Sequence, residues 1–426
     1  MISQNKDFFK ISLSGFIFFL LFIGSVNFSM RTSEAIETSL IDFSVLHRIV
    51  VFFILFSFVF YKLPRLLKTI KRNNLLRIFL YFCIYRIASS SWSVFPLWSF
   101  YRSVEFTIVF LFFVYILSTL DKSNFGLEKL KSHIRRLCFF YVLLMLTVIL
   151  GAIVWPDLAL SRGNNILPQI KGVIPRWNSN GIGQASAILV GISIVSIFYL
   201  KDKFSFLLLS LSLPMLLLAQ TRSALAPLLI FILWFVTKHF SYLTNILTYM
   251  ISFLIFLFLF ITSDIFIIVF DYLLRGQTSE QLLSFSSRFI VWEATLQNVE
   301  YNMFRLFFGL GAFAGGRLIA QRNFESLSEG APITTLDNTW LELWVDEGLF
   351  GVFFGLYIIF LAFLKIKHTP VGFFKAIGYC LFIIIIFRSF FVSSTFLHTN
   401  FFFMILIIIA VQLDNLRNLK NERIKL

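Results

Sequence analysis

The chain has 426 residues, of which 58% are hydrophobic and 14% charged, and its mean hydropathy is +0.85. Such values exclude an ordinary soluble domain. The formal net charge of +15 does not point to nucleic acid, because lysines and arginines that anchor the loops of a membrane protein account for it. The composition therefore indicates a membrane protein with no nucleic-acid partner.

Apolar runs long enough to cross a hydrocarbon core of about 30 Å as a helix recur along the whole chain. Continuous runs such as ISFLIFLFLF (251–260) exclude the alternating pattern of a β-barrel. Hydropathy predicts an all-α polytopic membrane protein with about 12 transmembrane helices. The predicted spans are 8–25, 45–61, 76–91, 101–120, 137–155, 182–200, 204–220, 223–240, 243–270, 343–364, 375–395 and 399–413.

The distribution of lysine orients these spans. The predicted loop 61–77 holds six Lys or Arg and no acidic residue. The positive-inside rule places such loops, and with them both termini, in the cytoplasm. The other segments predicted on this side all contain lysine: 121–136, 201–203, Lys238, 365–370 and 416–425.

The chain divides into helices 1–9 at residues 1–270, a large periplasmic loop at 271–342, and helices 10–12 with a cytoplasmic tail at 343–426. The loop contains no lysine but has arginines, which suggests guanidinium groups placed to bind phosphate. The alternative is that a long exported loop uses arginine without a function. Apolar residues at helical spacing predict interfacial helices within the loop.

Two arginines stand out on the predicted outer side. Arg222 in AQTRSA (219–224) lies between two apolar spans, where an ionisable group normally lines a polar cavity; an interfacial, snorkelling arginine is the alternative. Arg288 in SSRFIVWEA (286–294) follows a serine that can cap a helix, and Trp292 shares its helical face at i+4. The tryptophan alone is more typical of an interfacial anchor.

Further polar elements flank the other outer spans. The glycine-rich break FGLGAFAGG (308–316) predicts a tight turn with close backbone approach. In LDNTWLELWVDEGLFG (336–351), Asp337 or Asn338 is a natural helix cap, and Asp337 is also a candidate general base. PRWNSNGIG (175–183) places Arg176 and Asn180 at the start of another span.

The sequence predicts neither a metal site nor a cofactor. No His/Cys/Asp cluster in the sequence has metal-ligand spacing. Cys83, Cys138 and Cys380 lie within apolar runs and are interpreted as small buried hydrophobic residues.

The order of these motifs resembles the O-antigen ligase and polymerase family of bacterial envelope polysaccharide assembly. TRSA, SRFIVWEA with GLGAF, and DNTWLELWVDEGLFG are similar to successive family motifs. WNSNGIG looks like an earlier Asn-Pro-Asn element with Ser179 in place of proline, and SSSWSVFPLWSFYRS (89–103) looks like an early outer loop ending at Arg102. The resemblance covers roughly residues 80 to 365.

The resemblance implies a GT-C-like, metal-independent glycosyltransferase in the bacterial inner membrane, with its site facing the periplasm. Its donor is an undecaprenyl-diphosphate-linked oligosaccharide, whose diphosphate maps to Arg222 and Arg288. Ligases of the family carry histidine where Asp337 stands, and aspartate is the weaker base. This departure favours the Wzy-type polymerase, with Arg102, Arg176, Asn180, Trp292 and Asn338 as the expected substrate-binding residues.

Alternatives remain for the base and for the activity. His398 in STFLHTN is a second candidate base, although a helix-end histidine that caps carbonyls is the simpler interpretation. A ligase that joins glycan to the lipid A core is the alternative within the same class, and a flippase or transporter is the alternative from another class. Membrane lipid and a chain-length regulator protein are further expected partners.

Overall fold

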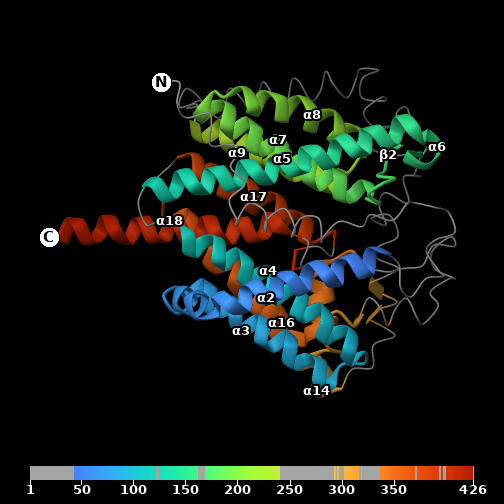
Figure 1. The fold of residues 1–426 in the computed structure, drawn as a ribbon, viewed down its shortest axis with the longest axis vertical. Coiled ribbons are helices and arrows are strands. Elements are labelled where there is room, and N and C mark those ends of the chain that lie inside the picture. The colour runs from blue at the N-terminus through green and yellow to red at the C-terminus, as the bar shows by residue number, and fades with distance from the viewer. Residues whose placement is uncertain are drawn as a thin grey trace.

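The structure, a computed structural model, describes residues 43–120, 124–161, 168–239, 292–293, 295–296, 302–315, 318, 336–369, 372–392, 395–396 and 400–425. Within them the chain forms a bundle of helices with one pair of short strands (Figure 1). The elements are α2 (Phe43–Lys71), α3 (Asn74–Ser89), η2 (Ser90–Trp92), α4 (Pro96–Thr119), α5 (Asn124–Val154), α6 (Pro156–Ala159), β1 (Leu160–Ser161), β2 (Gln169–Ile170), α7 (Ser179–Leu200), α8 (Lys203–Ala219), α9 (Arg222–His239), α14 (Met303–Phe308), α16 (Thr339–Lys367), α17 (Phe373–Ser389) and α18 (Phe401–Lys425).

Six of these helices are long and apolar enough to cross a membrane. They also leave large apolar side chains uncovered, such as Phe53 of α2, Leu233 of α9 and Phe353 of α16, which are each more than 60% exposed. Exposed apolar surface of this kind needs lipid rather than water around it. The protein is therefore an all-α polytopic membrane protein. The six spans are His47–Lys71, Pro96–Thr119, Gly126–Val154, Ser179–Leu200, Arg222–His239 and Thr339–Lys367.

The predicted spans that fall within the described residues each coincide with a helix. Helices α3, α8, α17 and α18 correspond to the predicted spans 76–91, 204–220, 375–395 and 399–413, in addition to the six above. The predicted spans 8–25 and 243–270 lie outside the described residues. The total of about 12 spans therefore stays a prediction.

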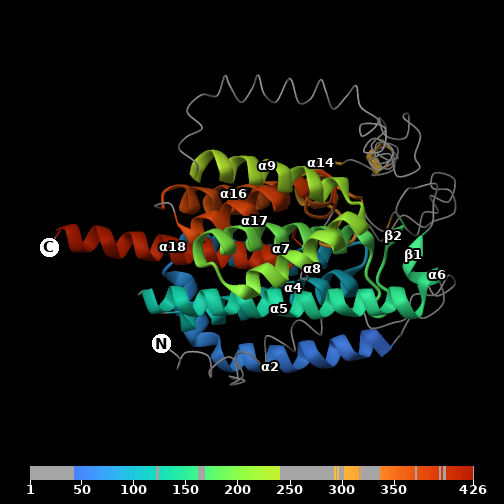
Figure 2. The same cartoon turned by 90° about the horizontal axis from the view of Figure 1, so that it is seen from above.

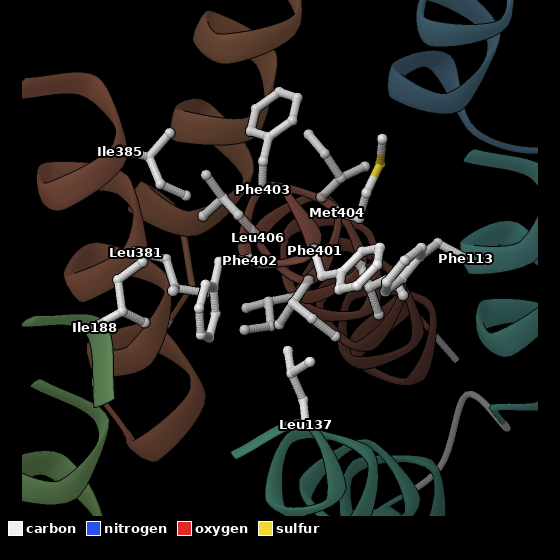
Figure 3. Packing of buried hydrophobic residues seen from close by; sticks show 14 of the residues in the cluster. Phe113, Leu137, Ile188, Leu381, Ile385, Phe401, Phe402, Phe403, Met404 and Leu406 are labelled. Carbon is white, nitrogen blue, oxygen red and sulfur yellow. The ribbon is translucent and has the colours of Figure 1, made fainter. Parts of the chain in front are cut away.

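Helix α18 is the interior helix of the bundle. Residues 401–411 are all buried. This stretch is apolar on every side of the helix, which is typical of a helix in the interior of a bundle. Helices α4, α5, α7, α16 and α17 surround it, and Figure 3 shows part of this packing at close range. The side chains labelled there are Phe401, Phe402, Phe403, Met404 and Leu406 of α18, with Phe113, Leu137, Ile188, Leu381 and Ile385 around them.

Two predicted cytoplasmic loops are helical, which corrects the sequence analysis. Helix α2 continues through most of 61–77 to Lys71, and α5 begins at Asn124 instead of near residue 137. Leu66 and Leu130 are fully buried in these extensions, so contacts with the bundle stabilise turns that hydropathy alone assigns to loops. In α2 the basic residues Arg65, Lys68 and Lys71 are exposed, whereas Lys131 and Arg135 of α5 are half-buried.

The outer and inner connections predicted from charge lie at opposite ends of the bundle. In Figure 2 the elements β1, β2, α6 and α14 gather at one end, whereas the C-terminal part of α18 projects at the other. The strands pair antiparallel, with Leu160 opposite Ile170. We call the end that carries β1, β2 and the starts of α7, α9 and α16 the polar end, and the opposite one the basic end.

Candidate functional site at the polar end

The starts of α7 and α9 are in direct contact at the polar end. The hydroxyl of Thr221 donates to the carbonyl of Ser179 at 3.1 Å. A Cβ added at Gly183 would lie 2.4 Å from the Thr221 Oγ1, so only glycine permits this approach. The predicted motifs 175–183 and 219–224 are therefore neighbours, although some 40 residues separate them. Arg222, the first residue of α9, is half-buried beside this contact.

Asn178 organises the start of α7. Its side-chain oxygen accepts from the Gly181 amide at 2.7 Å, which caps the helix. Arg176 and Asn180 flank this cap and are both half-buried. The role of Asn178 as the cap was not predicted from the sequence. Asn followed by small residues at the start of an apolar run was the available signal.

The start of α16 holds Asp337 in an unusual backbone conformation. Its φ is 48°, a left-handed value that asparagine and aspartate tolerate better than other side chains. Asn338 is the helix cap, accepting from the amides of Trp340 at 2.9 Å and Leu341 at 3.1 Å. This resolves the predicted choice between the two residues in favour of Asn338. The half-buried Asp337 side chain therefore precedes the helix instead of capping it.

Trp292 connects the large loop to this helix start. Its indole nitrogen donates to the carbonyl of Leu336, directly before Asp337, at 2.8 Å. Trp292 thus has a defined hydrogen bond to the protein in addition to any role as an interfacial anchor. Arg288 and His398 lie outside the described residues, so their placement stays a prediction.

Helix α16 is interrupted at Gly348, where φ is 67° and ψ is −166°. The interruption leaves helix carbonyls without their usual partners. The glycine-rich segment supplies them: the Leu310 amide donates to Val345 at 2.9 Å and the Gly311 amide to Asp346 at 2.8 Å. A Cβ at Gly348 would lie 2.2 Å from the Phe307 backbone, so two backbones touch here. The predicted tight turn and close approach are confirmed.

The carboxylate of Asp346 fastens the turn that follows. It accepts from the Gly315 amide at 2.6 Å and from the Phe313 amide at 3.1 Å. Its side chain is 3% exposed, so these bonds supply the partners that a buried carboxylate requires. This role of Asp346 is not predictable from the sequence, because a bond across more than 30 residues leaves no local pattern.

Arg86 and Glu347 form a buried ion pair behind the break. The Arg86 Nε lies 2.7 Å from the Glu347 Oε1, and the side chains are 3% and 0% exposed. The guanidinium also donates to the Phe396 carbonyl at 2.8 Å and packs 4.4 Å from the Phe82 ring centroid. Arg86 further lines a small cavity against α16 together with Glu342 and Asp346. Neither member of the pair was predicted from the sequence.

Arg102, a predicted substrate-binding residue, is held within α4. Its Nη1 lies 2.5 Å from the Glu105 Oε2, and its guanidinium packs 5.4 Å from the Trp98 ring centroid. Trp98 in turn donates to the carbonyl of Phe313 at 3.1 Å. Arg102 is thus adjacent to the glycine-rich segment, and its charge is balanced by Glu105.

A buried arginine that the sequence analysis missed joins the two halves of the polar end. Arg388, near the end of α17, is 1% exposed, and its Nη1 donates to the Ser223 hydroxyl at 3.5 Å. One turn further on, the Val392 carbonyl accepts from the Thr339 hydroxyl at 2.7 Å. Residues 388–392, at and just beyond the end of α17, therefore contact both the residue after Arg222 and the first residue of α16. An arginine in an apolar run was the signal available in the sequence.

The polar end thus carries cationic and acidic groups at helix starts, where backbone amides also favour anions. Arginine forks can bind phosphate, and a half-buried carboxylate can accept a proton from a hydroxyl. Within the described part of the chain, no group of three or more His, Cys, Asp or Glu could hold a metal ion. The chemistry that these residues can perform is anion binding with general-base assistance.

Comparison with known families places this site in context. Residues 204–356 match the family model described as O-antigen ligase. A search among curated proteins found no match to the chain. The matched range begins in α8 and ends in the second half of α16, so it contains Arg222, Arg288, Trp292, Asp337 and the glycine-rich break. The resemblance inferred from the motifs is confirmed over this range.

Proposed function

We propose that this protein, whose residues 204–356 match the O-antigen ligase family model, is a surface-polysaccharide polymerase of the bacterial inner membrane. The donor is a growing glycan on undecaprenyl diphosphate, and the acceptor is a hydroxyl of a fresh lipid-linked repeat unit at the periplasmic face. A glycosidic bond to the acceptor oxygen forms as the bond to diphosphate breaks. The acceptor proton passes to a base, and undecaprenyl diphosphate leaves.

The observation that carries this proposal is the contact of residues 388–392, at and just beyond the end of α17, with both motif helices. Arg388 bonds Ser223 next to Arg222, and Val392 bonds Thr339 at the start of α16. Candidate groups for the leaving diphosphate and for the acceptor hydroxyl therefore belong to one packed end of the bundle, in the region that the family match covers. Groups that must act in one step have to be held in one place.

Arg222 is assigned to the donor diphosphate, together with Arg288. Negative charge develops on the diphosphate as the sugar departs, and fixed cations lower the barrier by stabilising that charge. The position of Arg222 at the first turn of α9 supports this role, because the amides at a helix start favour an anion as well. Two arginine forks make a divalent cation unnecessary in the proposed reaction.

Asp337 is assigned to the acceptor hydroxyl, which it orients and deprotonates. Its backbone is fixed by the cap of Asn338 on one side and by the Trp292–Leu336 hydrogen bond on the other. Such support on both sides keeps a catalytic side chain in place. His398 stays the alternative base, and Arg102, Arg176, Asn180, Trp292 and Asn338 are assigned to substrate binding or to its support.

The first test replaces the charged residues in cells. Arg222→Ala, Arg288→Ala and Asp337→Asn are each expected to abolish the long chains in surface-glycan ladders. Arg305→Ala is the matched control, because it removes an arginine of the same loop that has no assigned role, and normal ladders are expected. Normal ladders for Arg288→Ala or Arg222→Ala, with normal protein levels, would refute the assignment.

A second test separates polymerase from its alternatives. Cells that lack a polymerase keep single repeat units on the lipid A core, whereas cells that lack a ligase keep a bare core and glycan on its carrier. Purified protein that extends lipid-linked units without an ion gradient excludes the flippase or transporter. A bare core in the deletion strain would instead support the ligase.

A further inference from the structure

The last turns of α2 present an exposed basic groove at the end of the bundle opposite the proposed catalytic site. Lys68, Lys71 and Arg72 line it together with Pro64 and Leu67, and all five residues are exposed. Pro64, Leu67, Lys68 and Lys71 lie within α2, and their spacing of three and four residues places them on one face of the helix. The apolar pair lies towards the membrane-spanning part of the helix, and the cations lie beyond it.

The length of α2 brings these cations to the level of the lipid headgroups. Its 29 residues extend about 44 Å at 1.5 Å per residue, which exceeds a hydrocarbon core of about 30 Å. Leu66 and Ile70 are buried on the opposite face, so the extension is packed against the bundle. The basic face is therefore held in a fixed orientation, pointing outward.

The charges of this groove have no acidic partner among the residues that the structure describes. Helix α2 contains no acidic residue, and in the described part of the chain no carboxylate pairs with Lys68, Lys71 or Arg72. Other cations at the basic end do have such partners, as in Arg135–Asp202 and Lys365–Asp414. Repulsion among adjacent like charges would be relieved by an anion from outside.

We propose that this groove is a binding site for an anionic phospholipid. Arg72 and the two lysines bind the headgroup phosphate, with the guanidinium able to form two parallel hydrogen bonds to it. The acyl chains lie along Pro64 and Leu67, the apolar part of the groove. A general attraction of basic loops to the membrane surface would not distinguish α2 from other cations at this end. A specific lipid site in this groove predicts that its cations bind the lipid more tightly than the other cations at this end do.

The experiment compares two triple variants of the purified full chain in neutral detergent. Lys68→Gln/Lys71→Gln/Arg72→Gln removes the groove cations. Lys201→Gln/Lys203→Gln/Lys238→Gln is the matched control, because it removes three exposed cations from the same end that lie outside α2. Phosphatidylglycerol is titrated against each protein, with phosphatidylcholine as the neutral lipid, and binding is followed by native mass spectrometry and by the shift in Tm.

Wild type and control are expected to bind phosphatidylglycerol equally, whereas the groove variant should lose at least about tenfold in affinity, since each cation contributes about fivefold at a charged surface. Equal losses in both triple variants, or no loss in either, would overturn the proposal. If the groove triple variant does not fold, Arg72→Gln alone takes its place in the binding comparison, because Arg72 lies beyond the last residue of α2. It should lose about fivefold.

Discussion

The Nε of Arg86 and the Oε1 of Glu347 lie 2.7 Å apart inside the bundle, joining α3 to the break in α16. Removing one partner leaves a buried charge without compensation, which costs about 3–5 kcal/mol. Glu347→Ala is therefore expected to lower the free energy of unfolding by this amount, measured in detergent by thermal or denaturant unfolding.

The double variant Arg86→Met/Glu347→Leu supplies the control for that prediction. It removes both charges and keeps apolar volume, so it should be more stable than either Arg86→Ala or Glu347→Ala. If the double variant lost as much as the sum of the two single losses, the side chains would not be interacting.

The close approach of Gly348 to the Phe307 backbone predicts that glycines differ sharply in their tolerance of alanine. Gly348→Ala places a Cβ 2.2 Å from the Phe307 backbone at a left-handed φ, so we expect a loss above about 2 kcal/mol in unfolding free energy. Gly372→Ala is the matched control, because an added Cβ there meets no atom within 4 Å, and it should stay within about 0.5 kcal/mol. Similar Tm values for the two variants would contradict the backbone contact.

Helices defined by continuous apolar runs are predictable from the sequence to within a few residues. The predicted spans 182–200 and 204–220 correspond to α7 (Ser179–Leu200) and α8 (Lys203–Ala219). The start of α5 at Asn124 is not predictable in this way, because its first turns are amphipathic and are stabilised by burial of Leu130. Such turns gain their stability from tertiary contacts rather than from hydropathy.

The same distinction between local and long-range interactions applies to the candidate site. The cap of Asn338 and the glycine-rich turn depend on local interactions, so the residue types at these positions predict them. The Arg86–Glu347 pair and the Arg388–Ser223 bond join residues far apart in the sequence, and a single sequence holds no pattern for such pairing. Arg288 and His398 lie outside the described residues and stay predictions.

Asp202 predicts a pH-dependent term in stability at the basic end. Burial alone would raise the pKa of Asp202, but hydrogen bonds from the Ser205 hydroxyl and amide and the charge of Arg135 outweigh it, so the pKa is lowered from its ordinary 3.8. A carboxyl with a lowered pKa in the folded state stabilises it above the ordinary pKa, and that contribution is lost as pH falls through the lowered value. Wild-type stability should therefore decrease below about pH 4 partly through this group.

Two substitutions separate the charge from the cap at this position. Asp202→Asn keeps a capping oxygen for Ser205 but loses the ion pair, so it should cost less than about 1 kcal/mol and remove this part of the acid dependence. Asp202→Ala should cost about 1 kcal/mol more, because the cap is lost as well. Unfolding curves of the three proteins between pH 3 and 7 provide the measurement, and identical acid dependence in all three would contradict the assignment.

Arg388 yields the prediction that bears most directly on the polar end. Its side chain is 1% exposed and bonds Ser223, so we expect it to act as a positioning residue for the start of α9 and hence for Arg222. A hydrogen bond to a charged group contributes about 1.5–3 kcal/mol, and its loss should lower the proposed polymerase activity by about 10- to 100-fold. Arg388→Lys keeps the charge and should retain more activity than Arg388→Leu.

The kinetics of the Arg388 variants tell positioning from a purely structural role. If Arg388 orients the group that stabilises the departing diphosphate, kcat should fall more than KM rises, while the purified variants keep a wild-type Tm within a few degrees. Ser223→Ala removes the acceptor of the same bond and should reproduce a weaker form of this pattern. A fall in Tm that accounts for the whole loss of activity would assign Arg388 to stability alone.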